Sequence, residues 1–195
     1  MFIEALILGV IIGLVRHGKI FRLSYVNFNI PQLVYTSALL YLGIIVMNLG
    51  LIDYNTSLYT AFLLISYILI AIFLIANIDK KFMLIPLVGL CSNLLCFIVN
   101  GFKFPLSSEA VLKYYGAEMI ELLKSGKIKF FIPAENASLS ILGNVIPINK
   151  ILSMTILSIG DIIISIGIVL VVQAIISDKH IQNRNRITFS KNIFR

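Results

Sequence analysis

The sequence predicts an all-α membrane protein, a bundle of five transmembrane helices with an external amphipathic segment between the fourth and fifth helices. Composition is the first observation behind this prediction. Hydrophobic residues make up 59% of the 195 residues and charged residues 13%, whereas soluble domains carry about 45–50% and about 25%. The second observation is that the apolar residues gather in long runs. Together they exclude a soluble globular domain, a disordered chain and a disulfide scaffold.

Apolar runs of about 18 residues or more are candidates to cross hydrocarbon roughly 30 Å thick. The first run is shorter and contains Glu4. It lacks a preceding basic region and a small-residue cleavage site, so we expect a span and not a removable signal peptide. Ala5, Gly9 and Gly13 form a ladder of small residues, which is typical of a helix-packing face. The expected spans are residues 1–15, 31–51, 57–78, 82–99 and 151–176.

The charges between the spans predict their orientation. Basic residues gather after the first span, after the third span and in the tail of residues 177–195. The connection after the second span carries Asp53 and no basic residue. Because cytoplasmic loops are enriched in Lys and Arg, we expect a multi-pass protein with its amino end outside and a basic cytoplasmic tail. The loop residues in question are Arg16, Lys19, Arg22, Lys80 and Lys81, with Asp79 as the acid among them.

The connection 100–150 then lies outside and is too long for a plain loop. Ser107 or Ser108 is placed to cap a helix over about 109–124. Such an amphipathic helix would either lie in the outer membrane interface or pack on the outer end of the bundle. We further expect a short strand at 127–132 and a partly buried or re-entrant piece at 135–148.

Asp161 is the polar residue that most needs explaining, because a carboxylate in hydrocarbon costs about 2.5–3.5 kcal/mol on insertion scales. The predicted span places it about ten residues, or roughly 15 Å, from the outer end of the helix. Ser158, Asp161 and Ser165 share one helix face. Gly160 and Gly167 allow a neighbouring helix to approach closely. Asp161 is therefore either a ligand, proton or catalytic site, or a structural clamp bonded to an Asn or Tyr of another span.

Other spans offer polar faces that would form a pocket with Asp161, open to the outer leaflet. One face of the fourth span carries Asn93, Cys96 and Asn100, and one face of the second carries Ser37, Tyr41 and Asn48. Taken alone, each of these residues is more typical of an interhelical hydrogen-bonding group than of a catalytic residue. The candidate pocket residues are Asp161, Ser158, Ser165, Asn93, Asn100, Asn144, Tyr41 and Asn48.

No metal site or cofactor is predicted. Cys91 and Cys96 are five residues apart and point to different faces of a helix, and His17 and His180 have no partner at ligand spacing. The net charge of +7 would suggest nucleic acid in a soluble protein. Here the basic residues lie between apolar runs, so the expected partners are membrane lipid and an unidentified membrane protein, and not nucleic acid.

Three elements in a fixed order carry a resemblance to a known family. They are Asn-Gly-x-x-x-Pro at 100–105 with Ser107 or Ser108 after it, Leu-Gly-Asn-Val-Ile-Pro at 142–147 and Ser-Ile-Gly-Asp at 158–161. Over nearly its whole length the chain resembles DUF5317, a bacterial membrane family of unknown function. The resemblance implies an integral protein of the bacterial plasma membrane, without an assigned activity.

A second, local resemblance is to lipoprotein signal peptidase, an aspartic membrane protease with a Gly-Asn-x-x-Asp-Arg element and an Ala-Asp at the start of its last helix. It would place Asp161 at the second aspartate of a dyad, in which two carboxylates share a proton. The first aspartate has no match, because Asn144 is followed by Val-Ile-Pro and an amide cannot titrate. Glu135 or Glu4 would have to replace it.

Three functions compete on these observations. The favoured one is a non-enzymatic membrane component that binds a lipid, a small hydrophobic ligand or a partner in the pocket around Asp161. An intramembrane aspartic hydrolase is the alternative, and it requires a second carboxyl group within about 5 Å of Asp161. An ion- or proton-coupled transporter is the third, although the sequence shows no internal repeat of the kind common in transporters.

Overall fold

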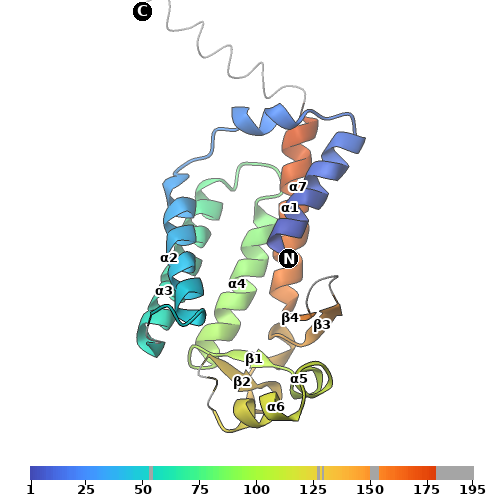
Figure 1. Cartoon of the computed structure of the whole chain (residues 1–195). Helices are drawn as coiled ribbons and strands as arrows, with labels where there is room; N and C mark the ends of the chain where they lie inside the picture. Colours follow the sequence, from blue (N-terminus) through green and yellow to red (C-terminus); the bar gives the residue numbers. More distant parts are fainter. Residues whose placement is uncertain (53–54, 127, 129, 150–153, 179–195) are drawn as a thin grey trace, which may run out of the picture.

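The computed structural model describes residues 1–52, 55–126, 128, 130–149 and 154–178, and within them the chain is mostly helical, as expected. Five helices form the body of the molecule (Figure 1). Their bounds are Phe2–Val15 for α1, Gln32–Asn48 for α2, Thr56–Ala76 for α3, Leu84–Val99 for α4 and Ile159–Ser177 for α7.

The two ends of the bundle differ in structure (Figure 1). At one end lie the connection between α1 and α2, the turn between α3 and α4 and the carboxyl end of α7; we call it the basic end. That connection contains a short 3-10 helix, η1 (Ile20–Tyr25). At the other end, the chain between α4 and α7 folds into a separate layer, which we call the cap.

Two of the helices, α3 and α7, are long and apolar enough to cross a membrane by length and composition, and α1, α2 and α4 are shorter apolar helices. The prediction of five transmembrane helices is therefore not confirmed. Turns within the apolar runs account for the shortening. Gly50, just after α2, has a φ of 70°, and Phe82, just before α4, has a φ of 67°.

The last helix begins at Ile159 and not at residue 151. A strand, β4 (Met154–Leu157), comes before it and pairs antiparallel with β3 (Ile146–Asn149); residues 150–153 lie outside the described part. Asp161 consequently lies in the first turn of α7. The expectation that it stands about ten residues into a helix is wrong, because the apolar run contains a strand followed by a helix.

The cap combines two short helices with four short strands, so the chain is not purely helical. β1 pairs with β2 in the parallel direction, whereas β3 pairs with β4 in the antiparallel direction. Ser107 caps the first helix as expected, since its side chain accepts a hydrogen bond from the backbone N–H of Ala110. The single helix expected over 109–124 is broken at Gly116, whose φ is 88°. The bounds are Phe104–Leu106 for β1, Ser108–Tyr115 for α5, Ala117–Lys124 for α6, Phe131–Pro133 for β2, and Ala134–Asn136 and Ser140–Leu142 for the 3-10 helices η2 and η3.

The cap has a hydrophobic core of its own. Ala110, Val111, Leu123 and Ile156 are buried together, so the helices α5 and α6 pack on the strands of the cap. Part of the amphipathic face remains uncovered, because Leu112, Tyr115 and Met119 are exposed. Packing within the cap thus accounts for the buried side of the helices. An interfacial position for the exposed side stays a prediction.

Small residues set the spacing between the helices, as expected. Gly9 lies against Val172 and Gly13 against Ile176, so α1 and α7 pack side by side and run in the same direction. Between α4 and α7, a Cβ at Gly89 would lie 2.6 Å from the carbonyl oxygen of Gly160. Such close backbone contacts favour helix association in a lipid environment, where hydrophobic burial between helices contributes little.

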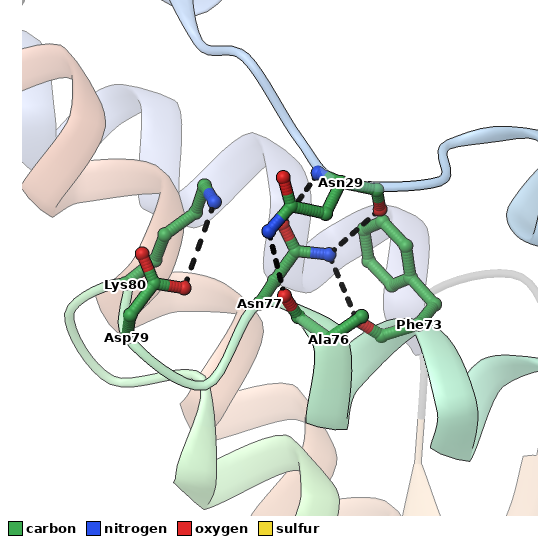
Figure 2. Close-up of polar contacts among 6 residues, drawn as sticks. All are labelled: Asn29, Phe73, Ala76, Asn77, Asp79 and Lys80. Carbon is green, nitrogen blue, oxygen red and sulfur yellow. Dashed lines mark hydrogen bonds and ion pairs between the residues drawn. The ribbon is translucent and has the colours of Figure 1, made fainter.

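Buried polar side chains hold the basic end together. Asn77 is fully buried; its Nδ2 donates to the carbonyl oxygens of Asn29 (2.9 Å) and Phe73 (2.8 Å), and its Oδ1 accepts from the backbone N–H of Asn29 (Figure 2). Arg22 is buried as well, and its guanidinium donates to the carbonyl oxygen of Ile176 at 2.7 Å. These bonds fix the connection between α1 and α2 to the ends of α3 and α7.

The close contact of α4 with α7 predicts that Gly167→Ala lowers stability. The added methyl group would collide with the ring of Pro86, and overpacking of this kind costs about 1–3 kcal/mol. Denaturant unfolding of the detergent-solubilised protein, followed by circular dichroism, measures the loss. Ala38→Val, which adds bulk at an exposed position of α2, is the control. Equal stability of the two variants would contradict the packing described here.

Candidate functional site

Ser158 and Asp161 form a capping box at the start of α7. The Ser158 side chain accepts a hydrogen bond from the Asp161 backbone N–H at 2.9 Å, and the Asp161 carboxylate accepts one from the Ser158 N–H at 3.3 Å. These bonds satisfy N–H groups that have no partner within the helix. The carboxylate also lies where the helix dipole favours negative charge. This local pattern explains why the helix begins at this point of the apolar run.

Asn93 of α4 joins the same pair. Its Nδ2 donates to Oδ1 of Asp161 at 2.8 Å, and its Oδ1 accepts from the Ser158 hydroxyl at 2.7 Å. Asn93 and Ser158 are 3% and 1% exposed, whereas Asp161 is partly exposed. Gly160 makes room for this contact, since a Cβ there would collide with the Asn93 amide. The three side chains form a closed network, the interhelical clamp that was one of the two expectations for Asp161.

Tyr67 of α3 extends the network to a third helix. Its hydroxyl lies near the Asn93 side chain and within electrostatic range of the Asp161 carboxylate. Tyr41, an expected pocket residue, has a side chain that is 53% exposed. The sequence analysis missed Tyr67. A polar side chain within the apolar run of the third span was the available signal.

The other expected pocket residues have separate roles. The Ser165 hydroxyl donates to the backbone oxygen of Asp161 at 2.8 Å and does not reach its carboxylate by this bond. Asn100 joins the end of α4 to the cap, because its Nδ2 donates to the carbonyl oxygens of Cys96 and Ser138, each at 2.8 Å. Asn48 is exposed at the carboxyl end of α2.

Asn144 belongs to the sheet of the cap. Its N–H donates to the carbonyl oxygen of Pro105 at 2.7 Å, and its carbonyl oxygen accepts from the N–H of Ser107 at 3.0 Å. It also forms a parallel bridge with Leu106, which makes it a third strand position beside β1. The backbone of Asn144 thus positions the first turn of α5.

The two acids that a catalytic dyad would recruit are engaged elsewhere. The Glu135 carboxylate accepts a hydrogen bond from the Ser108 hydroxyl at 2.8 Å within the cap. Glu4 forms an ion pair with the amino-terminal ammonium group at the start of α1. Each hydrogen bond that the structure gives the Asp161 carboxylate comes from a neutral donor, either the Asn93 amide or the Ser158 N–H.

Metal-binding clusters are absent from the described residues: no group of three or more His, Cys, Asp or Glu side chains is placed to hold an ion. Cys91 is exposed and Cys96 buried, and both are free thiols. Their different exposure agrees with the different helix faces expected from their spacing.

The chain matches the family of unknown function DUF5317 over residues 25–173. The chain belongs to DUF5317. The matched region contains α2, α3, α4, the cap and most of α7, and therefore every residue of the network around Asp161. None of the curated proteins and none of the solved structures matched. Membership in DUF5317 confirms the family resemblance but assigns no activity to the site.

The closed network predicts that Asn93→Ala destabilises this DUF5317 protein by about 2–4 kcal/mol, because the Asp161 carboxylate and the Ser158 hydroxyl both lose a partner. Chemical unfolding in detergent measures the effect. Asn48→Ala removes the same side chain from an exposed position and is expected to cost less than about 0.5 kcal/mol. A similar cost for both variants would contradict an interhelical role for Asn93.

The hydrogen bonds of Glu135 predict that the stability of the cap depends on pH. Hydrogen bonds from its own backbone N–H and from Ser108 lower the pKa of its carboxyl below the ordinary 4.5. A lowered folded-state pKa stabilises the protein above the unfolded pKa, and this contribution is lost as pH falls through the folded value. Below about pH 4.5 the melting temperature should fall more steeply in the wild type than in Glu135→Gln. Glu118→Gln, at an exposed position of α6, should follow the wild type; a parallel fall in Glu135→Gln would contradict the assignment.

Proposed function

We propose that the chain is an integral protein of the bacterial plasma membrane that binds a lipid or another small hydrophobic molecule beside Asp161, without catalysis. In this proposal the cap faces the outside, the amino end is outside and the carboxyl end is cytoplasmic. The tail of residues 179–195, which the sequence predicts to be cytoplasmic, lies outside the described residues.

Exposed apolar side chains support the membrane location. Large hydrophobic residues are exposed along α1, α2, α3 and α4, whereas soluble monomers rarely expose more than a few hundred Å² of contiguous apolar surface. Among them are Ile7 and Ile11 of α1, Leu39 and Leu42 of α2, Ile68 and Ile72 of α3, and Leu95 and Ile98 of α4. The position of the basic loops supports the orientation, because these loops lie together at the end of the bundle away from the cap (Figure 1).

One observation carries the binding proposal: Asp161 is a partly exposed carboxylate whose described hydrogen-bond donors are all neutral. A carboxylate can accept about four hydrogen bonds, so this one keeps capacity for a ligand. Its position where the apolar bundle meets the cap favours a molecule with an apolar body. A positively charged or hydrogen-bond-donating group on that molecule would complement the carboxylate.

Binding explains the site better than hydrolysis or transport. An aspartic hydrolase needs a second carboxylate that shares a proton with the first, and both candidate acids, Glu135 and Glu4, are engaged in other contacts. Asn93 occupies the side of Asp161 that faces α4. A coupled transporter has no specific observation in its favour.

The proposal predicts that Asp161→Asn loses the bound molecule while the fold persists. Native mass spectrometry of the protein, purified from bacterial membranes in mild detergent, detects the co-purified molecule. The amide retains one of the two carboxylate contacts, so the loss of stability should be about 1–2 kcal/mol. Resistance of the wild type to alkaline carbonate extraction tests the membrane location independently.

Ser165→Ala is the matched control, because it lies one turn further along the same helix face and leaves the carboxylate in place. It should retain the bound molecule. A wild-type protein that carries no ligand, or an Asp161→Asn variant that keeps it, would leave Asp161 as a structural clamp and overturn the proposal.

A further inference from the structure

The basic end repeats one arrangement three times. The ammonium group of Lys19 lies 5.6 Å from the ring centroid of Phe21, that of Lys80 lies 5.8 Å from Phe28, and that of Lys81 lies 5.7 Å from Phe82. The three lysines come from two separate connections that meet at this end of the bundle (Figure 1). We call these six residues the basic rim.

The pairing of an aromatic ring with a lysine suits the boundary between hydrocarbon and water. Aromatic side chains gather at that depth in membrane proteins. Lysines extend their charged ends from the same depth towards the headgroups. Ile20 and Phe21 of η1 are 53% and 43% exposed and add apolar surface beside Lys19. The rim therefore presents positive charge just above an apolar surface.

The backbone that carries these lysines is fixed. The N–H of Lys19 donates to the carbonyl oxygen of Ile176 at 3.0 Å, and Arg22 donates to the same oxygen. The turn that carries Lys80 follows Asn77, which is bonded to the opposite connection through Asn29 (Figure 2). A site whose backbone is already ordered loses less entropy when it binds.

The charge of this end is strongly positive. Its described acids are Asp79 and Asp178, and Asp79 is a largely exposed partner of Lys80 at 3.8 Å. The basic residues at the same end are the three rim lysines, Arg16 and Arg22. In the cap, four glutamates (Glu109, Glu118, Glu121 and Glu135) are interspersed with six lysines, so the charges there are closer to balance. The basic end, with five basic residues and two acids, has the larger excess of positive charge, which complements an anionic surface.

We propose that the basic rim is a binding surface for the phosphate headgroups of anionic phospholipids in the leaflet at this end of the bundle. The proposal rests on the membrane location proposed above but not on a ligand at Asp161. It gives this end of the protein a lipid preference that the cap end lacks.

The test measures phosphatidylglycerol binding to the detergent-purified full chain by native mass spectrometry, with phosphatidylcholine as the neutral lipid. The combined change Lys19→Ala, Lys80→Ala and Lys81→Ala should weaken phosphatidylglycerol binding about fivefold for each lysine, or about 100-fold in all. Binding of phosphatidylcholine should not change. The triple change to Arg, which keeps the charge, should keep the affinity.

The matched control removes three lysines from the cap, Lys103, Lys113 and Lys124, of which Lys113 also lies over a ring, that of Tyr114, at 5.2 Å. This variant should bind phosphatidylglycerol like the wild type. The proposal is overturned if both triple variants weaken binding equally, or if neither does. Ligand retention beside Asp161 and carbonate extraction are measured separately, so failure of the proposed function is distinguishable from failure of the rim.

Discussion

The hydrogen bonds that join Asn93 to Ser158 and Asp161 are the constraint on which the junction of bundle and cap depends. They require α4 and α7 to approach within backbone contact, which Gly89 and Gly160 permit. In surroundings of low dielectric constant these bonds are strong, and a missing partner is correspondingly costly. The hydrogen bonds of Asn93 and the close contact of α4 with α7 at this point therefore depend on each other.

The cap and the last helix are coupled through the same residues. Ser158 directly follows β4 and is also the N-cap of α7, so the end of the β3–β4 hairpin determines where the helix starts. The N–H of Val145 donates to the carbonyl oxygen of Leu157 at 3.1 Å and holds this hairpin closed. A movement of the hairpin would displace the first turn of α7, and the Asp161 carboxylate with it. The cap therefore does more than cover the bundle.

Much of the helical body could be predicted from the sequence, because long apolar runs and basic loops are local signals. The small-residue contacts of α1 and the Ser107 cap were also predictable for this reason. The start of α7 was not: its apolar run continues through β4, and only the pairing of β4 with β3 distinguishes the strand from the helix that follows it. The bond between Asn93 and Asp161 was an open alternative until the geometry brought residues 68 positions apart together.

The contact between α1 and α7 has a consequence for the order of assembly. Gly9 and Gly13 emerge from the ribosome with α1, whereas their partners Val172 and Ile176 come far later in the sequence. During translation this face of α1 therefore has no contact with α7 until α7 has been synthesised. The contact between α1 and α7 thus forms late relative to the synthesis of α1, and a chain that lacks α7 would leave Gly9 and Gly13 without these partners.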